Sequence, residues 1–373
     1  MEQKEAGQKI TAYKGLDMNF RCREFQYEVG KEYKSGKTVK VCRSGFHACT
    51  NPLEVWDYYP VYNSRFAEVE LGGVMDKEDG SSKICSSEIK IKKELTLSDY
   101  IGLCVAWMND LAKVGDNSAK IGSSGDSTKI GSSGDSAQIG SSGYYAQIGS
   151  SGDSTKIGSS GDSAQIGSSG DYAQIGSSGD STKIGSSGNS AKIGSSGDYA
   201  KIGSSGNSAK IGSSGYYAQI GSSGNSAKIG SSGNSAKIGS SGDYAKISSS
   251  GDYAKIGSSG DYAKISSSGY SVKINSSGDY AKISSSGDYA KISSSDYYAK
   301  INSSGDSAVI MCAGIKSKAK AKKGSWITLS EWELEDERYV PVCVKTEQVD
   351  GVKIKEDTWY KLKGGVFVET TTD

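Results

Sequence analysis

Isoleucine recurs at every ninth position from Ile121 to Ile310, 22 times without an insertion or deletion. The unit around it reads (Asp/Asn/Tyr)-(Ser/Tyr)-Ala-(Lys/Gln)-Ile-(Gly/Ser/Asn)-Ser-Ser-Gly. Because side chains alternate along a strand, Ala and Ile point to one side, and Ser/Tyr and Lys/Gln point to the other. The Gly-Ser-Ser-Gly-Asp segment has the composition of a turn, in which we expect Gly to supply positive φ angles. Each unit therefore predicts one short strand and one turn.

One such strand buries nothing alone, but copies stacked about 4.8 Å apart form continuous ladders of Ile and Ala. Burial of one Ile contributes about 2 kcal/mol, so the series can offset the ordering of a Gly/Ser-rich chain. A flexible Gly/Ser linker has no reason to keep Ile in register. Residues 116–314 are thus predicted to form a β-solenoid in a mainly β protein. Two units per coil are favoured over three, and the 27-residue spacing of Thr128, Thr155 and Thr182 is attributed to duplication.

The outward ladders carry the candidate binding residues. Lys precedes the ladder Ile in 16 units and Gln in five, and Tyr is concentrated in the second half of the block. We expect Asp at the turns to neutralise the lysines locally. A Tyr/Lys/Ser surface suits contact with a macromolecule, whereas the alternative is that the tyrosines only stack on one another and stiffen the sheet. The candidates are Tyr217, Tyr244, Tyr253, Tyr262, Tyr280, Tyr289, Tyr298, Lys246, Lys255 and Lys264.

The flanks predict two further domains. Residues 1–115 are expected to be α+β, and a helix over Leu97–Val114 has apolar residues three and four apart, so we expect it to cap the first coil. Residues 315–373 are expected to be all-β, with Lys316–Lys323 as a last irregular coil. The N-terminal strands are predicted at 9–13, 38–42, 65–71 and 83–92, with a short helix from Asn51 to Tyr59. The C-terminal strands are predicted at 325–333, 339–348, 352–355, 359–362 and 366–369.

Charge, cysteine and histidine content narrow the function classes. With 44 Lys and Arg against 43 Asp and Glu, the chain has no overall field that would gather nucleic acid or an anionic membrane. No apolar run is long enough for a membrane helix, and the N-terminal residues lack a signal-peptide core. Seven cysteines, an odd number, favour free thiols in a reducing cytoplasm. Calcium binding by the turns is not expected because Asp stands one position early relative to known nonapeptide loops.

A zinc site could be built from a few residues of the first domain, namely Cys42, His47 and Cys49 with Cys22 or Cys85. Their spacing fits no common structural zinc site, so buried thiols are favoured. We expect no metal, no cofactor and no catalytic residue.

Three stretches of the first domain resemble the core of the ADP-ribosyltransferase family. Ala12-Tyr13-Lys14-Gly15 is similar to its opening strand, and the segment from Ser44 to Pro52, with Tyr58-Tyr59, is similar to the part that packs on nicotinamide. Arg65–Gly72 and Glu88–Leu95 resemble later strands. The resemblance implies a shared fold. Lys14 stands where the family has His or Arg, and Ser86 and Ser87 precede Glu88 where its glutamate begins the last motif, so an active transferase is the less favoured expectation.

The full layout resembles proteins encoded by tailed phages and prophages of gut bacteria, in which a similar first domain precedes Gly/Ser/Asp/Ala repeats. The repeats also resemble the β-roll heads of trimeric autotransporter adhesins. The residues that carry the phage resemblance are Tyr13-Lys14-Gly15, Gly45-Phe46-His47, Asn51-Pro52, Tyr58-Tyr59-Pro60, Gly324 to Trp332 and Asp357 to Leu362.

These observations predict a non-catalytic interaction protein whose solenoid presents its ladders to a macromolecular partner. A protein partner is favoured, a homo-oligomer and a nucleic acid remain open, and a membrane is not expected. The phage resemblance implies an inhibitor or decoy of a host defence complex in the cytoplasm. The alternatives are a virion- or tail-associated structural or adhesive module and a transferase with degenerate motifs.

Overall fold

The computed structural model describes residues 9–36, 39–41, 43–61, 63–77, 81–109 and 118–371. The contacts divide the chain into two compact units. The first comprises Met1–Gln174, Thr182–Asn189 and Lys201–Ser205, and therefore holds the N-terminal α+β domain and early coils of the solenoid. The second comprises Ile175–Ser181, Ser190–Ala200 and Gly206–Asp373, and holds the later coils and the C-terminal strands.

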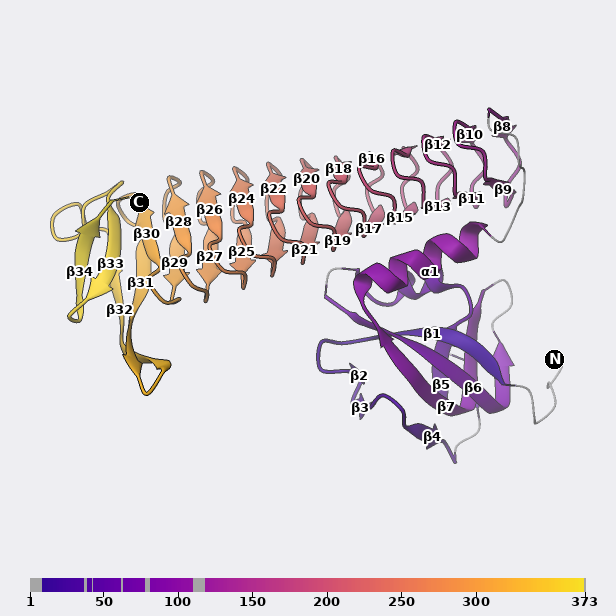
Figure 1. Cartoon of the computed structure of the whole chain (residues 1–373), viewed down its shortest axis with the longest axis horizontal. Helices are drawn as coiled ribbons and strands as arrows, with labels where there is room; N and C mark the ends of the chain where they lie inside the picture. The colour runs from indigo at the N-terminus through magenta and orange to yellow at the C-terminus, as the bar shows by residue number, and fades with distance from the viewer. Residues whose placement is uncertain are drawn as a thin grey trace. The chain divides into compact units, whose positions relative to one another are not determined.

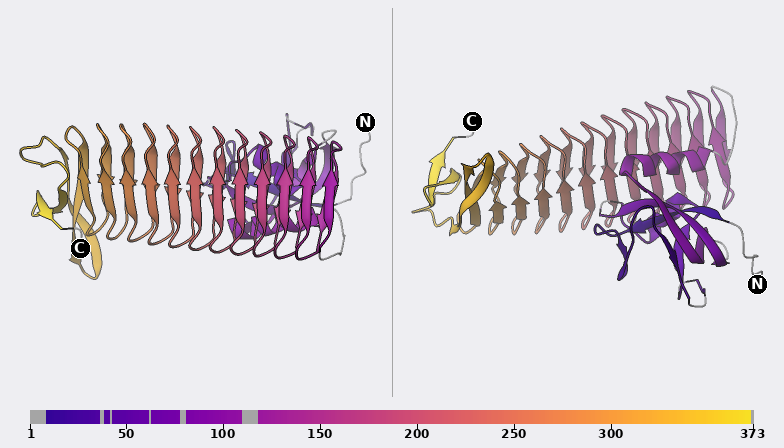
Figure 2. Two further views of the ribbon diagram at one scale, coloured as in Figure 1. Left: turned by 90° about the horizontal axis from the view of Figure 1, so that it is seen from above. Right: turned by 60° about the horizontal axis from the view of Figure 1, so that its bottom comes forward.

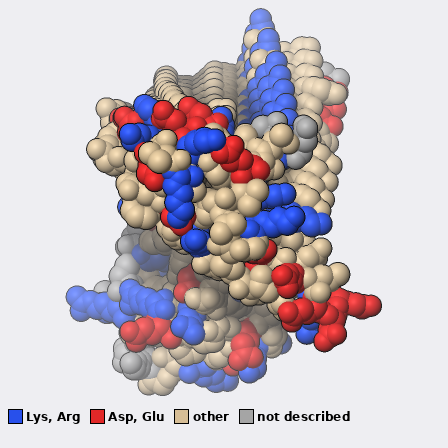
Figure 3. Space-filling view, turned by 90° about the vertical axis from the view of Figure 1, so that its left-hand side faces the viewer, with Lys and Arg blue, Asp and Glu red and all other residues tan. Residues whose placement is uncertain are grey.

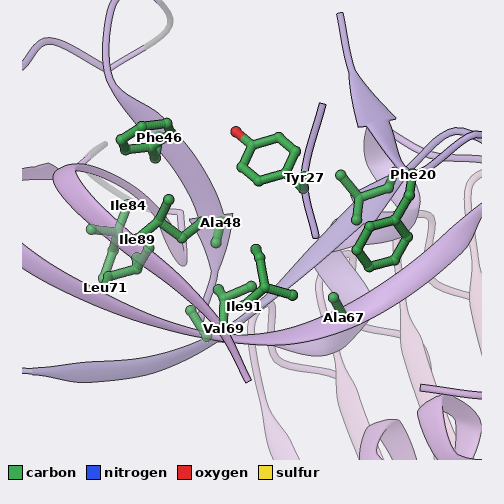
Figure 4. Packing of buried hydrophobic residues seen from close by; sticks show 12 residues of the cluster. Phe20, Tyr27, Phe46, Ala48, Ala67, Val69, Leu71, Ile84, Ile89 and Ile91 are labelled. Atoms are coloured by element: carbon green, nitrogen blue, oxygen red, sulfur yellow. The ribbon is translucent and has the colours of Figure 1, made fainter. Parts of the chain in front are cut away.

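The N-terminal domain is a small, strongly curved antiparallel sheet with two helices (Figure 1). Its order is β4-β7-β5-β1-β6, and β6 also pairs with β7, which closes the sheet on itself. Apolar side chains from these strands, among them Val69, Leu71 and Ile91, fill the interior (Figure 4). The elements are β1 (Ile10–Leu16), β2 (Arg21–Cys22), β3 (Phe25–Gln26), β4 (Glu32–Lys34), β5 (Phe46–Cys49), the 3-10 helix η1 (Pro52–Asp57), β6 (Arg65–Lys77), β7 (Lys83–Leu95) and the helix α1 (Leu97–Asn109).

Local capping explains where the two helices begin. The Asn51 side chain accepts a hydrogen bond from the backbone N–H of Leu53, at the start of η1. Thr96 and Asp99 bond each other's backbone N–H groups at the start of α1, which is a capping box. The helix expected from Asn51 to Tyr59 is thus a 3-10 helix.

The other N-terminal predictions are mostly confirmed. The strands expected at 9–13, 65–71 and 83–92 are confirmed, and β6 and β7 are longer than predicted because they form one bulged hairpin. The strand expected at 38–42 is wrong for its described residues 39–41, which make only an isolated bridge between Lys40 and Ser44. Residues 38 and 42 lie outside the described residues, as do residues 110–114 at the end of the helix expected from Leu97. The sequence analysis predicted neither β4 nor β5 as a strand.

The repeat forms a β-solenoid of about 12 turns with two strands per turn, as expected (Figures 1 and 2). One sheet, here the even sheet, contains β8 (Lys120–Ser123), β10 (Gln138–Ser141), β12 (Lys156–Ser159), β14 (Gln174–Ser177), β16 (Lys192–Ser195), β18 (Lys210–Ser213), β20 (Lys228–Ser231), β22 (Lys246–Ser249), β24 (Lys264–Ser267), β26 (Lys282–Ser285), β28 (Lys300–Ser303) and β30 (Lys318–Ala321). The odd sheet contains β9 (Lys129–Ser132), β11 (Gln147–Ser150), β13 (Gln165–Ser168), β15 (Lys183–Ser186), β17 (Lys201–Ser204), β19 (Gln219–Ser222), β21 (Lys237–Ser240), β23 (Lys255–Ser258), β25 (Lys273–Ser276), β27 (Lys291–Ser294) and β29 (Val309–Cys312).

Identical positions pair in register, two units apart. In the second compact part of the chain, Ile229 pairs with Ile247 and Ile247 pairs with Ile265, and all three are almost fully buried. The strand continues past Ile for two residues, so a Ser follows Ala and Ile into the interior. Ser249 and Ser267 are buried, and their hydroxyls have no hydrogen-bond partner in the described part of the chain. Each nine-residue unit therefore buries three residues, Ala, Ile and Ser, rather than the two that were expected.

The turn glycines are needed for close approach between coils, and the expectation that they supply positive φ is wrong. Where a described repeat has a positive φ, it falls on the residue before the inward Ala, Thr or Val, as at Ser226 (59°) and Tyr262 (56°). A Cβ on Gly260 would lie 2.1 Å from the carbonyl oxygen of Gly242, one coil earlier. Backbone of one turn thus occupies the space that a side chain of the next would need.

The helix α1 does not cap the end of the solenoid, contrary to expectation. Within the first unit it packs against β11, β13 and β15, on the outer face of the odd sheet. Gly185 in β15 lies under Cys104 and Val105, where a Cβ would be at 3.8 and 3.9 Å from their side chains. The apolar stripe that suggested a cap instead covers a sheet face.

The C-terminal strands end both sheets by reversing strand direction. They are β31 (Trp326–Glu335), β32 (Arg338–Gln348), β33 (Trp359–Lys363) and β34 (Val366–Thr370). β31 continues the odd sheet in parallel and β32 returns antiparallel to it, while β33 pairs antiparallel with β30 in the even sheet. The irregular coil expected at 316–323 is confirmed as β30. The strand expected at 352–355 is wrong, because Asp350 binds the backbone N–H groups of Val352, Lys353 and Ile354 in a turn.

Candidate functional site

The structure separates the predicted binding residues onto two sheets. Tyr244, Tyr262, Tyr280, Tyr298, Lys246 and Lys264 precede or begin even-sheet strands, whereas Tyr217, Tyr253, Tyr289 and Lys255 belong to the odd sheet. The ten residues therefore lie on two opposite faces, since successive units alternate between the two sheets.

Four tyrosines form one uninterrupted stack at the turns of the even sheet. We call Tyr244, Tyr262, Tyr280 and Tyr298 the tyrosine edge. Their ring centroids are 4.8–5.0 Å apart and their planes differ by 2–8°. Each ring therefore lies parallel to the next, and the two middle rings have both faces covered by neighbouring rings. The four residues remain 36–56% exposed. Burial, followed by the neighbouring phenols, raises the pKa of Tyr262, so this ring is uncharged at neutral pH.

Backbone and aspartate hydrogen bonds hold the tyrosine edge in place. Tyr262 has a φ of 56°, a conformation that bulky residues rarely adopt, and its N–H donates to the carbonyl oxygen of Asp279 in the next coil. The Asp243 carboxylate accepts the N–H of Asp261, and Asp261 in turn accepts that of Asp279. The turn aspartates therefore bind backbone groups one coil ahead. Whether they also neutralise the lysines remains a prediction.

The odd-sheet tyrosines form a broken series. Tyr199 and Tyr217 stack at 5.3 Å, but Ser235 and Ser271 interrupt the positions that follow. Tyr270 fills the gap from the neighbouring turn position, at 5.8 Å from Tyr253 and 5.2 Å from Tyr289, with its ring steeply inclined to both. Only the even sheet thus carries a regular aromatic ladder.

A row of exposed lysines runs beside the tyrosine edge, two residues further along each strand. This lysine ladder consists of Lys192, Lys210, Lys228, Lys246, Lys264 and Lys282, in register in β16 to β26. In the described part of the chain none of the six forms an ion pair or a side-chain hydrogen bond. Adjacent ammonium groups about 5 Å apart repel by roughly 1 kcal/mol in water. A continuous ridge of basic side chains is visible in Figure 3.

A shallow groove of about 760 Å³ lies on the same even-sheet strands. Gly and Ser line it from the two positions after each ladder Ile and from the turn that follows. We call it the serine groove; its lining includes Ser214, Ser232, Ser250, Ser268 and Ser286. The even face therefore combines a phenol ladder, an ammonium ladder and a hydroxyl-lined groove.

The N-terminal domain holds a second cavity, of about 1140 Å³. We call it the N-terminal pocket. It gathers the segments that resemble transferase motifs: Tyr13 to Gly15 from β1, Ser44 to Cys49 around β5, and Tyr58 and Tyr59 after η1. Gly15 is required there, because a Cβ would lie 2.3 Å from the ring of Tyr59. The sequence pattern named these segments, but it could not show that they meet.

Buried polar groups set the character of this pocket. Lys14 is 3% exposed and its ammonium donates to the carbonyl oxygen of His47, at 2.8 Å. Burial lowers the pKa of Lys14, and burial followed by the Lys14 charge lowers the pKa of His47, which is therefore neutral at pH 7. The Tyr59 hydroxyl lies 2.9 Å from the Cys22 sulfur. Glu88 does not line the pocket and pairs with Lys34 at 2.9 Å.

The proposed zinc ligands do not converge. His47 and Cys85 face each other across β5 and β7, and Cys42 lies outside the described residues. Among the described residues no three His, Cys, Asp or Glu side chains are grouped to hold a metal ion. Burial raises the pKa of the Cys49 thiol to about 12, so it is protonated. None of the helices in the described ranges has the length and apolar character needed to cross a membrane.

The fold defines a β-solenoid protein with an α+β domain at one end of the chain and a small β region at the other. Residues 10–103 match the model of a family described as a domain of unknown function (DUF7666). No curated protein and no solved structure matches the chain significantly.

Proposed function

We propose that this chain is a non-catalytic interaction protein that binds a macromolecular partner through the even face of its solenoid. The observation that supports the proposal most is the alignment of the tyrosine edge with the lysine ladder over consecutive coils. Tyr244 and Tyr262 lie in the turns two residues before Lys246 and Lys264, which begin β22 and β24, and all four side chains are exposed. Exposed, pre-ordered phenols lose little conformational freedom on binding, which favours them in recognition surfaces.

The odd face supports the proposal less well. Its tyrosine series is broken, and in the first unit its outer glycines are buried where α1 packs. The self-stacking alternative explains the contacts between rings. It leaves unexplained why the exposed lysines continue beside them without partners in the described residues.

The test compares two sets of four substitutions in affinity purification from expressing cells, followed by quantitative mass spectrometry of the captured proteins, nucleic acids and glycans. One variant replaces Tyr244, Tyr262, Tyr280 and Tyr298 with Ser, the residue that the repeat itself uses at Ser208 and Ser226. The control replaces Tyr199, Tyr217, Tyr253 and Tyr289 with Ser. We expect the first variant to lose, by about tenfold, macromolecules that the wild type and the control retain. Equal capture by all three would refute the proposal.

The resemblance to phage proteins extends the proposal to an inhibitor or decoy of a host defence complex, acting in the cytoplasm. The competing role is a virion- or tail-associated structural or adhesive module. Purified particles separate the two roles, because only the second requires the chain to be present in them.

A second candidate function is a transferase that uses the N-terminal pocket. The meeting of three motif-like segments in one cavity supports it, and the position of Glu88 outside that cavity weakens it. Label transfer from NAD⁺ that is abolished in Lys14→Gln and unaffected in Glu88→Gln would favour this candidate. Absence of transfer by the wild type would remove it.

A further inference from the structure

We infer that the partner of the even face is a linear acidic polysaccharide, of the polyuronate class, which lies along the lysine ladder and the serine groove. This inference rests on the proposed function and names the chemistry of its ligand. It depends on the spacing of the lysines, the lining of the groove and the closed faces of the tyrosine stack.

The lysine ladder repeats one positive charge per coil. Lys228, Lys246 and Lys264 pair directly in register, so their spacing is that of hydrogen-bonded strands, about 4.8 Å. The carboxylates of a polyuronate repeat once per sugar ring, and a ring is about as long as this spacing. A linear polyanion of this class can lie along the ladder, bring carboxylates to its ammonium groups and relieve the repulsion between them.

The serine groove supplies hydroxyl groups on the same strands. Ser232, Ser250 and Ser268 follow the strands that carry Lys228, Lys246 and Lys264. A hydroxyl can donate and accept hydrogen bonds, as can the hydroxyls of a sugar ring. The Gly and Ser residues that line the groove have no large apolar side chains against which the anchoring residues typical of a protein partner could pack.

The tyrosine edge disfavours single-stranded nucleic acid. Proteins that bind single strands offer open aromatic faces on which bases stack. Here Tyr262 and Tyr280 have both faces covered by neighbouring rings within 5.0 Å. Only the ring rims and hydroxyls face outward, which suits contact with a polar chain. The aspartates of the same coils hold backbone N–H groups in the turn, as Asp243 and Asp261 do, three residues before each lysine.

The experiment measures binding of the full chain to an oligogalacturonate by isothermal titration calorimetry at several salt concentrations. One variant carries Lys228→Gln, Lys246→Gln, Lys264→Gln and Lys282→Gln. The matched control carries Lys237→Gln, Lys255→Gln, Lys273→Gln and Lys291→Gln on the odd sheet of neighbouring coils. Gln stands naturally at the same strand position at Gln138 and Gln147, so both variants preserve the strand pattern.

We expect the even-sheet variant to bind about 30-fold or more weakly than the wild type and to lose most of the salt dependence, while the control changes little. Equal losses in both variants, or no binding of the wild type, would overturn the inference. So would equal or tighter binding of a neutral oligosaccharide, of polyglutamate or of oligo-dT, which would identify another class of ligand. If the glycan fails while tyrosine-dependent capture persists, the proposed function stands and only its ligand is wrong.

Discussion

Early strands of the odd sheet and late strands of the even sheet carry the same repeat in different surroundings. In β15 and β17 the residue after the ladder Ile is a buried Gly, and α1 or η1 packs directly over it. In β22 and β24 the same position is Ser248 or Ser266, which is exposed. The ladder Ile and the residue two positions before it, which is Thr182 in β15 and Ala in the other three strands, are equally buried in both regions.

The stacking of coils fixes the residue types at the inward positions of the repeat. The residue types at the outward positions depend instead on what packs against each face. A residue after Ile must be Gly where another element approaches closely, as at Gly203, and can be Ser or Asn where nothing does. The early even-sheet glycines, such as Gly158, are exposed, and nothing in the structure explains why they are Gly.

The largest expected loss of stability comes from substituting a turn glycine, a feature that the two regions share. Gly260→Ala places a Cβ 2.1 Å from the Gly242 carbonyl oxygen. The control is Gly257→Ala in the same nine-residue repeat, where the new Cβ has no atom within 4 Å. We expect Gly260→Ala to destabilise the adjacent coils by about 2 kcal/mol, because backbone must move. Amide hydrogen exchange in β22 to β24 should then be about 30-fold faster than in the control.

A Gly→Ala change at the equivalent turn position in the first compact part of the chain should have the same effect as Gly260→Ala. A Cβ on Gly152 would lie 2.0 Å from the Gly134 carbonyl oxygen, so Gly152→Ala should also destabilise its coils. Unchanged exchange in both alanine variants would mean that coils can separate at little cost, and the explanation of the turn glycines would be lost.

The next effect tests what differs between the regions. Gly203→Asn adds a side chain where a Cβ already meets Trp56 at 3.0 Å and Ile101 at 3.2 Å. Gly257→Asn is the matched control on the same sheet, where Asn275 occupies the equivalent position of the next strand. We expect the first variant to weaken the packing of α1 by about 1–2 kcal/mol and the control to leave it unchanged.

Exchange of the α1 amides measures this difference. Faster exchange in Gly203→Asn alone would support a covering role for the N-terminal domain within the first unit. Equal α1 protection in both variants would show that the packing seen at Gly203 contributes nothing to stability.

Much of the fold could be predicted from the sequence because the period and residue pattern of the repeat determine its geometry. A strict nine-residue period with alternating Ala and Ile predicts strand, turn and stacking, and the pairing of Ile229 with Ile247 confirms two units per coil. The inward Ser231 was missed, since Ser-Ser between two glycines has the composition of a turn. The position of α1 was missed too, because an apolar helical stripe shows that something is covered but not what.

The candidate site was predictable only in part. Tyr262 and Lys264 were correctly placed outward, because period-two alternation fixes their direction. Their separation from Tyr253 and Lys255 follows from two strands per coil, which composition alone favoured but did not establish. The N-terminal pocket depends on contacts between Gly15, His47 and Tyr59, and sequence separation hides such contacts.

The smallest effect concerns the one late turn where Asp replaces the repeat's Gly. Asp296 has a carboxylate oxygen that is buried without a hydrogen-bond partner in the described residues. Burial, followed by the charge of Asp279, raises the pKa of Asp296 above the ordinary 3.8. The folded state thus favours the protonated acid, and its contribution to stability is greatest below pH 3.8 and is lost as the pH rises through the folded-state pKa.

Asp296→Gly should therefore stabilise the solenoid at pH 7, by about 0.5–1 kcal/mol, as restoration of a consensus residue often does. The gain over the wild type should shrink at pH 3, where the wild-type carboxyl is protonated in both states. Thermal unfolding followed by circular dichroism at the two pH values measures this, with Asp296→Asn as the control that removes charge and keeps size. If Asp296→Asn reproduces the pH-dependent part of the gain in stability and Asp296→Gly adds a further gain that is the same at both pH values, then the charge and the size of the Asp296 side chain each destabilise the turn separately. A gain from Gly that is equal at both pH values would leave crowding as the only cost.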